Sequence, residues 1–264
     1  MKYQPVSIIK NAKLASGIFR LILQTEPGVE VLPGQFVQIK TNARHTLLPR
    51  PISVSDYDFS TGKLTLVIQE KGPGTAAICS LLPGDKTEIL WPLGNGLKIS
   101  SESKKIWLFG AGLGLAPMLY AARKWAGEGR SVTALCGFRN AGLAYYIDEM
   151  KALCNNVTVA TDDGSLGVGG TVTEALRHWL AAHDPAADEL AVYSCGPEPM
   201  MRATADQALA RGYACELALE RHMACGMGTC QSCVVKLRDT NDQGWRFHLC
   251  CTDGPVFDAR EILW

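Results

Sequence analysis

The chain has 264 residues, of which 47% are hydrophobic and 20% charged, and 26 basic residues balance 26 acidic ones. This length exceeds what one hydrophobic core usually serves, so two or three domains are expected. The balanced charge excludes the basic surface typical of nucleic-acid-binding proteins. The N-terminal segment MKYQPVSIIK lacks the apolar core and cleavage site of a signal peptide, which predicts a cytoplasmic protein.

One uncharged stretch approaches the length of a membrane span. Residues 106–122 (IWLFGAGLGLAPMLYAA) contain no charge, and a span needs about 20 such residues. Three alternating glycines and Pro117 interrupt this stretch. Such residues favour a strand, a tight turn and a helix start, so no membrane segment is expected.

The first part of the chain, residues 1–98, has the pattern of an all-β domain. Six short alternating segments are separated by turn-forming residues: VSIIK, IFRLILQT, QFVQIK, PISVSD, KLTLVIQE and KTEILW. This pattern predicts a six-stranded antiparallel β-barrel, because closure removes exposed sheet edges. One helix is expected over Thr75–Leu82, directly after Gly72-Pro73-Gly74.

Beyond a polar linker over Lys98–Lys105, the periodicity changes. Strand-like and helix-like segments alternate over residues 104–212, which predicts a doubly wound, parallel α/β domain that binds a nucleotide. Residues 213–264 are rich in cysteine and irregular, and they are expected to form a small metal-binding unit. The predicted fold class is therefore all-β plus α/β, with a small cysteine-rich C-terminal domain.

Four of the ten cysteines have a specific spacing. Cys225, Cys230 and Cys233 follow the pattern C-x4-C-x2-C, and Cys251 comes after a gap of 17 residues. This is the spacing of a plant-type 2Fe-2S cluster, which needs four thiolates. A zinc site, which usually has two CxxC-like pairs, and unligated core thiols are the alternatives. Buried structural thiols are the expectation for the other six: Cys79, Cys136, Cys154, Cys195, Cys215 and Cys250.

Two motifs in the barrel suit a flavin nucleotide. Arg50-Pro51-Ile52-Ser53 begins a strand, and its guanidinium can bind a pyrophosphate while Ser53 can reach the polar edge of a flavin ring. Gly72-Pro73-Gly74-Thr75 begins a helix, whose free N–H groups favour phosphate. The alternatives are a structural turn and an ordinary helix cap.

Two further motifs suit a nicotinamide nucleotide. Gly110, Gly112 and Gly114 follow a strand and precede a helix, which lets the backbone approach a pyrophosphate. The motif departs from GxGxxG, and no acidic residue follows about 20 residues later, so the preference for NAD or NADP is left open. Cys195-Gly196 ends a later strand, where the thiol can pack against a nicotinamide ring or be an ordinary buried cysteine.

Taken in order, RPIS, GPGT, WPLGNG, GAGLGLAP, SCGPEPMM and MACGMGTCQSC…CCTDGPVF resemble the ferredoxin-reductase superfamily, and within it the electron-transfer subunits of type B dihydroorotate dehydrogenase. The resemblance picks Cys251 over Cys250 as the fourth cluster ligand. It implies FAD contacts from Arg50, Pro51, Ile52, Ser53, Val67, Ile68, Gln69, Gly74 and Thr75. The chain departs from many superfamily members where Ile52 replaces an aromatic residue, and Gln69 lies where a basic residue would be unsurprising.

The resemblance also implies a function. Electrons are expected to pass from the FMN of a dihydroorotate-oxidising partner subunit through the 2Fe-2S cluster and FAD to NAD+, in pyrimidine biosynthesis and in a heterotetramer with two copies of each chain. No residue of this chain is expected to act as a general acid or base. The alternatives are an NAD(P)H–ferredoxin or acceptor reductase, a bifurcating or hydrogenase-associated diaphorase subunit, and a regulatory module with vestigial sites.

Overall fold

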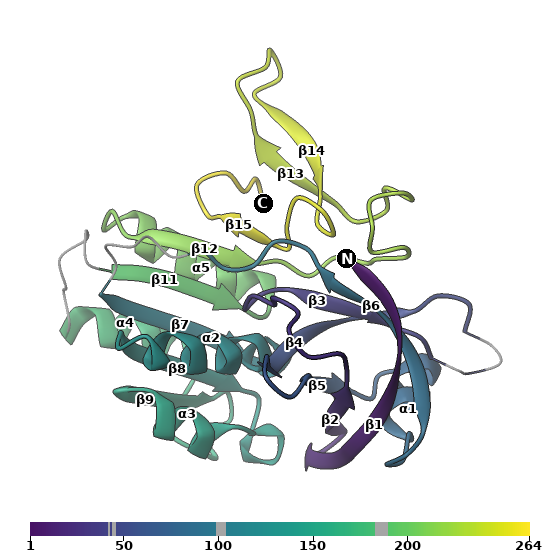
Figure 1. Cartoon of the computed structure of the whole chain (residues 1–264). Coiled ribbons are helices and arrows are strands. Elements are labelled where there is room, and N and C mark those ends of the chain that lie inside the picture. Colours follow the sequence, from purple (N-terminus) through teal and green to yellow (C-terminus); the bar gives the residue numbers. More distant parts are fainter. Residues whose placement is uncertain (42, 44–45, 99–103, 183–189) are drawn as a thin grey trace.

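A computed structural model describes residues 1–41, 43, 46–98, 104–182 and 190–264. Six antiparallel strands at the N-terminal end form a closed barrel in the order β1-β2-β5-β4-β3-β6 (Figure 1). These strands are β1 (Lys2–Ala15), β2 (Ile18–Gln24), β3 (Phe36–Ile39), β4 (Arg50–Asp58), β5 (Lys63–Gln69) and β6 (Lys86–Leu93). The predicted six-stranded barrel is confirmed.

One helix, α1 (Pro73–Cys79), joins β5 to β6. It begins two residues before the expected Thr75, because proline is favoured in the first turn of a helix. The helix ends at Cys79, and the expected continuation to Leu82 is therefore wrong. Its N-terminus follows the end of β5 and carries Gly74 and Thr75 of the second flavin motif.

The second sheet has seven strands in the order β10-β9-β8-β7-β11-β12-β15. Six are parallel: β7 (Lys105–Ala111), β8 (Ser131–Phe138), β9 (Asn156–Thr161), β10 (Val168–Gly169), β11 (Leu190–Cys195) and β12 (Ala214–Ala218). The chain runs outward from β7 to β10 and then returns to place β11 on the other side of β7. This reversal makes the sheet doubly wound, as predicted, and puts the switch point between β7 and β11.

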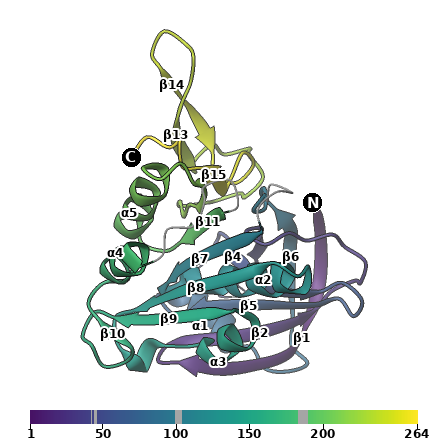
Figure 2. The same ribbon diagram turned by 90° about the vertical axis from the view of Figure 1, so that its left-hand side faces the viewer.

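Helices cover both faces of this sheet (Figure 2). The face toward the barrel carries α2 (Leu115–Gly127), preceded by the 3-10 turn η1 (Gly112–Gly114), and α3 (Ile147–Leu153), preceded by η2 (Ala141–Leu143). The opposite face carries α4 (Val172–Ala182) and α5 (Glu198–Leu209). Residues 106–122, the uncharged stretch, supply most of β7 and the buried side of α2. No helix of the described residues is long and apolar enough to cross a membrane.

The C-terminal unit is more regular than the sequence indicated. The strands β13 (Val234–Arg238) and β14 (Trp245–Leu249) form a hairpin that projects from the body of the molecule (Figures 1 and 2). The chain then returns, and β15 (Val256–Asp258) adds an antiparallel edge strand to the large sheet beside β12. The division of the chain into domains at residues 98, 104, 212 and 213 stays a prediction. The expected linker, Lys98–Lys105, lies largely outside the described residues.

Strand β3 is buried on both faces. Val37 and Ile39 point into the core of the barrel. Phe36, on the opposite face, packs in the same hydrophobic cluster as Cys233 and Cys251. The cysteine-rich unit therefore covers the outside of the barrel at β3, next to the strand that begins with the flavin motif.

Candidate functional site

The loop between β12 and β13 carries three of the four spaced cysteines. Gly226 and Gly228 have φ values of 73° and 86°, which glycine adopts readily, and they let this loop curl on itself. The sulfur of Cys225 accepts hydrogen bonds from the backbone N–H groups of Met227 and Cys230, both at 3.4 Å. Backbone donors aimed at a sulfur stabilise the thiolate form, which is the form that binds metal.

The four spaced thiols lie in two pairs. Hydrogen bonds from Ser232 and from Cys225 lower the pKa of Cys230 to about 6. In the other pair, the N–H of Cys251 donates to the sulfur of Cys233 at 3.4 Å, and burial together with Cys233 raises the pKa of Cys251 to about 12. Because each iron of a 2Fe-2S cluster takes two thiolates, two neighbouring pairs are the donor set that it requires.

Within the described part of the chain, no group of three or more His, Cys, Asp or Glu side chains converges on a position for a metal ion, so the contacts among the four spaced thiols are pairwise.

Cys250, the neighbour of Cys251, has a different environment. Its side chain is fully buried, and its thiol donates a hydrogen bond to the carbonyl of Leu219 at 3.4 Å. Burial raises the pKa of Cys250 to about 12. Burial raises the pKa of Cys251 equally, so the two thiols differ only in their contacts: Cys250 donates to a carbonyl, whereas Cys251 lies beside the sulfur of Cys233, which favours Cys251 as the ligand.

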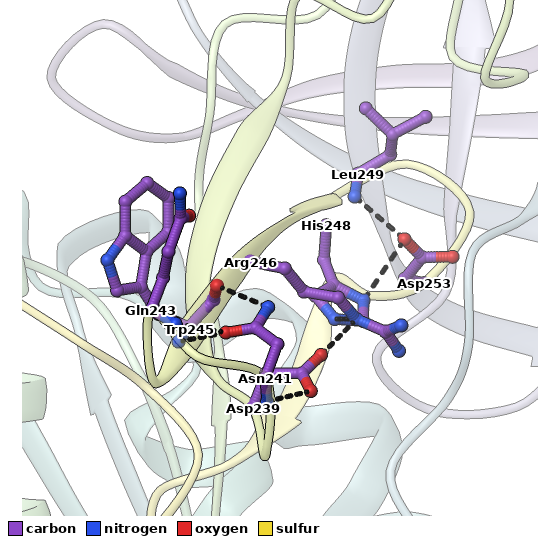
Figure 3. A network of polar contacts seen from close by, with 8 residues as sticks. All are labelled: Asp239, Asn241, Gln243, Trp245, Arg246, His248, Leu249 and Asp253. Carbon is purple, nitrogen blue, oxygen red and sulfur yellow. Dashed lines mark hydrogen bonds and ion pairs between the residues drawn. The ribbon is translucent and has the colours of Figure 1, made fainter.

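A polar network fixes the turn that carries Cys250 and Cys251 (Figure 3). The carboxylate of Asp253 accepts the N–H of Leu249 at 2.8 Å and lies 3.4 Å from Nδ1 of His248. On the other side of the imidazole, Arg246 donates to Nε2 of His248 at 2.9 Å and lies 2.8 Å from the carboxylate of Asp239. The network therefore connects the hairpin to the segment that follows the fourth thiol.

The barrel contacts the same turn through Asn95. Its backbone N–H donates to the carbonyl of Gly254 at 2.6 Å, and its side-chain amide donates to the carbonyls of Thr252 and Asp253 at 3.2 and 2.8 Å. The sequence motif WPLGNG contains Asn95, but nothing in that motif indicated which segment it contacts. Asn95 is thus a site residue that sequence reasoning missed.

The two flavin motifs lie together. A Cβ atom on Gly74 would lie 2.5 Å from Nη2 of Arg50, so the guanidinium packs directly over the first turn of α1. Arg50 also donates to the carbonyl of Leu48 at 2.7 Å. The hydroxyl of Thr75 accepts the backbone N–H groups of Lys71 and Gly72, so it is engaged in capping the helix. A guanidinium beside free helical N–H groups fits the phosphates of a nucleotide.

The remaining candidate flavin residues differ in how much of their surface is exposed. Pro51, Ile52 and Ser53 are half-buried on β4. Val67 and Ile68 are buried as whole residues, so neither presents open surface to a ligand in this structure. The register that pairs Val54 with Leu66 brings the start of β4 to the end of β5, where Gln69 is half-buried.

The nicotinamide motifs meet at the switch point of the large sheet. Gly110 of β7 lies opposite Cys195 of β11, and a Cβ on Gly114 would lie 2.0 Å from the carbonyl oxygen of Cys195. Gly112 is exposed with open space around it, so its backbone is accessible to a ligand. The side chain of Cys195 is only 3% exposed, while Gly196 is half-buried. Gly114 is therefore required for packing, and Gly112 presents the open surface.

Comparison with known proteins agrees with this geometry. Residues 220–263 match the model of the iron-sulfur cluster binding domain of dihydroorotate dehydrogenase B, and residues 108–206 match the oxidoreductase NAD-binding domain. The chain is 34% identical over 256 residues to the dihydroorotate dehydrogenase B (NAD(+)) electron transfer subunit of Caldanaerobacter subterraneus, covering 97% of this chain and 96% of that protein. Identity to the Listeria welshimeri subunit is 35% over 260 residues, covering 97% of each. The chain belongs to this family.

Solved structures show the same architecture. An NADH-dependent reduced ferredoxin-NADP oxidoreductase aligns with a TM-score of 0.84 and 27% identity, over 98% of this chain and 90% of that chain. A Neisseria gonorrhoeae ferredoxin NADP+ reductase with bound FAD and NADP aligns with a TM-score of 0.69 and 17% identity, over 85% of this chain and 96% of that chain. The family member is thus an oxidoreductase subunit with a ferredoxin-reductase-like fold, and its domains imply a flavin and an iron–sulfur cluster.

Proposed function

We propose that this chain carries electrons from the FMN of a dihydroorotate-oxidising partner, through a 2Fe-2S cluster and FAD, to NAD+, in pyrimidine biosynthesis. The observation that carries the proposal is the position of the paired thiols against β3, next to the strand on which Arg50 lies. Membership of the electron transfer subunit family supplies the expected donor and acceptor. The proposed assembly is a cytoplasmic heterotetramer with two copies of each subunit.

The proposed cofactor residues follow from the sites described above. The cluster ligands are Cys225, Cys230, Cys233 and Cys251. The FAD residues are Arg50, Pro51, Ile52, Ser53, Val67, Ile68, Gln69, Gly74 and Thr75, of which Val67 and Ile68 are buried. The NAD residues are Gly110, Gly112, Gly114, Cys195 and Gly196, with Gly112 as the most accessible.

The proposed role of this chain is to bind the flavin and the cluster and to orient them. A bound flavin supplies the conversion between single electrons and a hydride. Arg50 and the N-terminus of α1 neutralise phosphate charge, and the N–H groups directed at Cys225 stabilise negative charge at the thiolates. Because substrate deprotonation belongs to the partner, no general acid or base of this chain is needed.

Co-expression tests this function. The chain is co-expressed with an FMN-containing dihydroorotate dehydrogenase subunit, and the purified complex is mixed anaerobically with dihydroorotate and NAD+. We expect NADH to form, with equal amounts of the two subunits in a species of heterotetramer mass. A chain that purifies with its cofactors but never associates with such a partner, and yields no NADH from dihydroorotate, contradicts the proposal.

The likeness to the NADH-dependent reduced ferredoxin-NADP oxidoreductase supports a second candidate, in which the partner oxidises or reduces a different substrate. The dehydrogenase that co-purifies with the chain from its native cells distinguishes the two. Dihydroorotate oxidation by that partner supports the first candidate, and ferredoxin-dependent NADP reduction supports the second.

A further inference from the structure

Gln38 is a buried amide without a partner. It lies on β3, its side chain is only 2% exposed, and neither Oε1 nor Nε2 has a hydrogen-bond partner among the described residues. Leaving a buried polar group unpaired is costly, and native proteins leave few such groups. A polar group that forms a hydrogen bond with the amide of Gln38 is therefore expected at this position.

The cluster loop lies against this side chain. A Cβ atom on Gly226 would lie 2.6 Å from Cγ and 2.8 Å from Nε2 of Gln38. Gly226 directly follows Cys225 in the sequence. The amide of Gln38 is thus packed against the backbone of the loop beside the first thiol, and any larger residue at position 226 would displace it.

On the other side, Gln38 is next to the flavin motif. It pairs with Pro51 across the β3–β4 ladder, and Pro51 follows Arg50. Paired residues of an antiparallel ladder project from the same face, so both project outward from the barrel. Gln38 is therefore the polar side chain of β3 on the face toward the cluster loop, and the neighbouring strand β4 carries the flavin motif, whose Arg50 pairs with Ile39 and so projects from the other face.

We propose that the side-chain N–H group of Gln38 donates a hydrogen bond to an inorganic sulfide of the cluster, and thereby raises the reduction potential of the cluster. The position of Nε2 against Gly226 favours the cluster over the flavin as the acceptor. Hydrogen bonds to cluster sulfurs stabilise the added negative charge of the reduced state. This inference rests on the proposed cluster ligands, and it gives Gln38 a role in setting the reduction potential of the cluster.

The test is an anaerobic redox titration of the full chain followed by EPR. Gln38→Met keeps the length of the side chain and removes the donor, and Gln38→Glu replaces the amide with an acceptor. We expect both variants to lower the midpoint potential of the cluster relative to the wild type, with the larger shift in Gln38→Glu, while the flavin potential stays unchanged.

Gln24→Met is the matched control. Its amide contacts the carbonyls of Thr25 and Thr61 on the other side of the barrel, so this change should leave the cluster potential at the wild-type value. A cluster potential in Gln38→Met equal to that of the wild type overturns the proposal, as does a shift confined to the flavin.

A second measurement uses the wild-type chain, so that it does not depend on the folding of a variant. Pulsed EPR of the reduced protein, labelled with 15N in the glutamine side chains, should show nuclear coupling to the cluster, and Gln231→Asn, which removes the labelled amide between Cys230 and Cys233, should retain it. Absence of that coupling overturns the role of Gln38. A wild-type chain with no iron–sulfur EPR signal at all refutes the proposed cluster instead, so the two failures are distinguishable.

Discussion

The side-chain amide of Asn95 donates a hydrogen bond to the carbonyl oxygen of Asp253 at 2.8 Å. Asn95 follows the last strand of the barrel, and Asp253 lies two residues beyond Cys251. The barrel therefore contacts the turn that carries Cys251, and these hydrogen bonds fix the position of the candidate cluster site relative to the candidate flavin site. A constant separation between two cofactors favours electron transfer between them.

Removing this contact should loosen the cluster site. Asn95→Ala deletes two side-chain hydrogen bonds, each with a net stabilisation of about 1 kcal/mol, so the free energy of unfolding should fall by about 1–2 kcal/mol. An iron chelator should also strip the variant faster than the wild type, as followed by visible absorption.

Gln24→Ala is the control, because it also removes two amide-to-carbonyl hydrogen bonds but lies away from the cysteine-rich unit. It should lose similar stability and keep the wild-type rate of iron loss. Equal rates of iron loss in Asn95→Ala and Gln24→Ala would show that the contact does not serve the cluster.

The two adjacent cysteines should respond differently to serine. Cys251→Ser replaces a proposed ligand, so the EPR signal of the reduced cluster should be lost and the iron content should fall from about two atoms per chain. Cys250→Ser should retain both, since a serine hydroxyl can also donate to the carbonyl of Leu219. Retention of a normal cluster in Cys251→Ser, with loss in Cys250→Ser, would reverse the ligand assignment.

A single methyl group should disturb the flavin site. Gly74→Ala places a Cβ atom within 2.7 Å of the guanidinium of Arg50, which must move. We expect the dissociation constant for FAD to rise about tenfold, as in Arg50→Ala, because a hydrogen bond to a charged group contributes about 1.5–3 kcal/mol. Equilibrium titration of the flavin-free chain measures this constant.

The double variant Arg50→Ala/Gly74→Ala should bind FAD no more weakly than Arg50→Ala, because both changes remove the same interaction. Gly72→Ala is the neighbouring control: a Cβ there meets no atom within 4 Å, so FAD binding should be unchanged. Additive losses in the double variant would show that Gly74 acts independently of Arg50.

Glu216 should make stability depend on pH. Burial raises the pKa of Glu216 in the folded chain to about 7, above its usual value of 4.5, although its carboxylate accepts the N–H of Lys98 at 2.8 Å. The folded state therefore binds more protons than the unfolded state between these values, so stability should fall as pH rises from 4.5 to 7. The loss should be on the order of 2 kcal/mol.

Denaturant unfolding at several pH values tests this expectation. Glu216→Gln should match the wild type near pH 5, where the folded carboxyl is protonated, and exceed its stability at pH 8. A wild type and variant whose stabilities differ by the same amount at both pH values would show that Glu216 does not titrate in this range.

Much of the architecture could be predicted because its signals are local. Period-two alternation and turn residues indicated the six barrel strands, and the glycines after β7 indicated the switch point. The hairpin of β13 and β14 was missed, because a polar turn of six residues separates two strands of five residues each. The edge strand β15 was missed as well, since three residues carry too short a pattern.

The side chains that connect the sites could not be predicted, because their partners are distant in the sequence. Gln38 and Gly226 are brought together by the docking of the C-terminal unit on β3, and Asn95 meets Asp253 in the same way. A glutamine within a strand and an asparagine within a turn are both common, so neither residue type indicates a functional role. The roles of Gln38 and Asn95 become visible only in their tertiary contacts.

The most direct test of the electron path uses the complex with an FMN-containing dihydroorotate dehydrogenase subunit in which this chain carries Cys251→Ser and retains FAD. Anaerobic stopped-flow absorption follows the complex after it is mixed with dihydroorotate and NAD+. The proposed path predicts rapid reduction of FMN with NADH formation at least a hundredfold slower than in the wild type, a rough expectation for a lost relay. NADH formation at the wild-type rate without the cluster would contradict it.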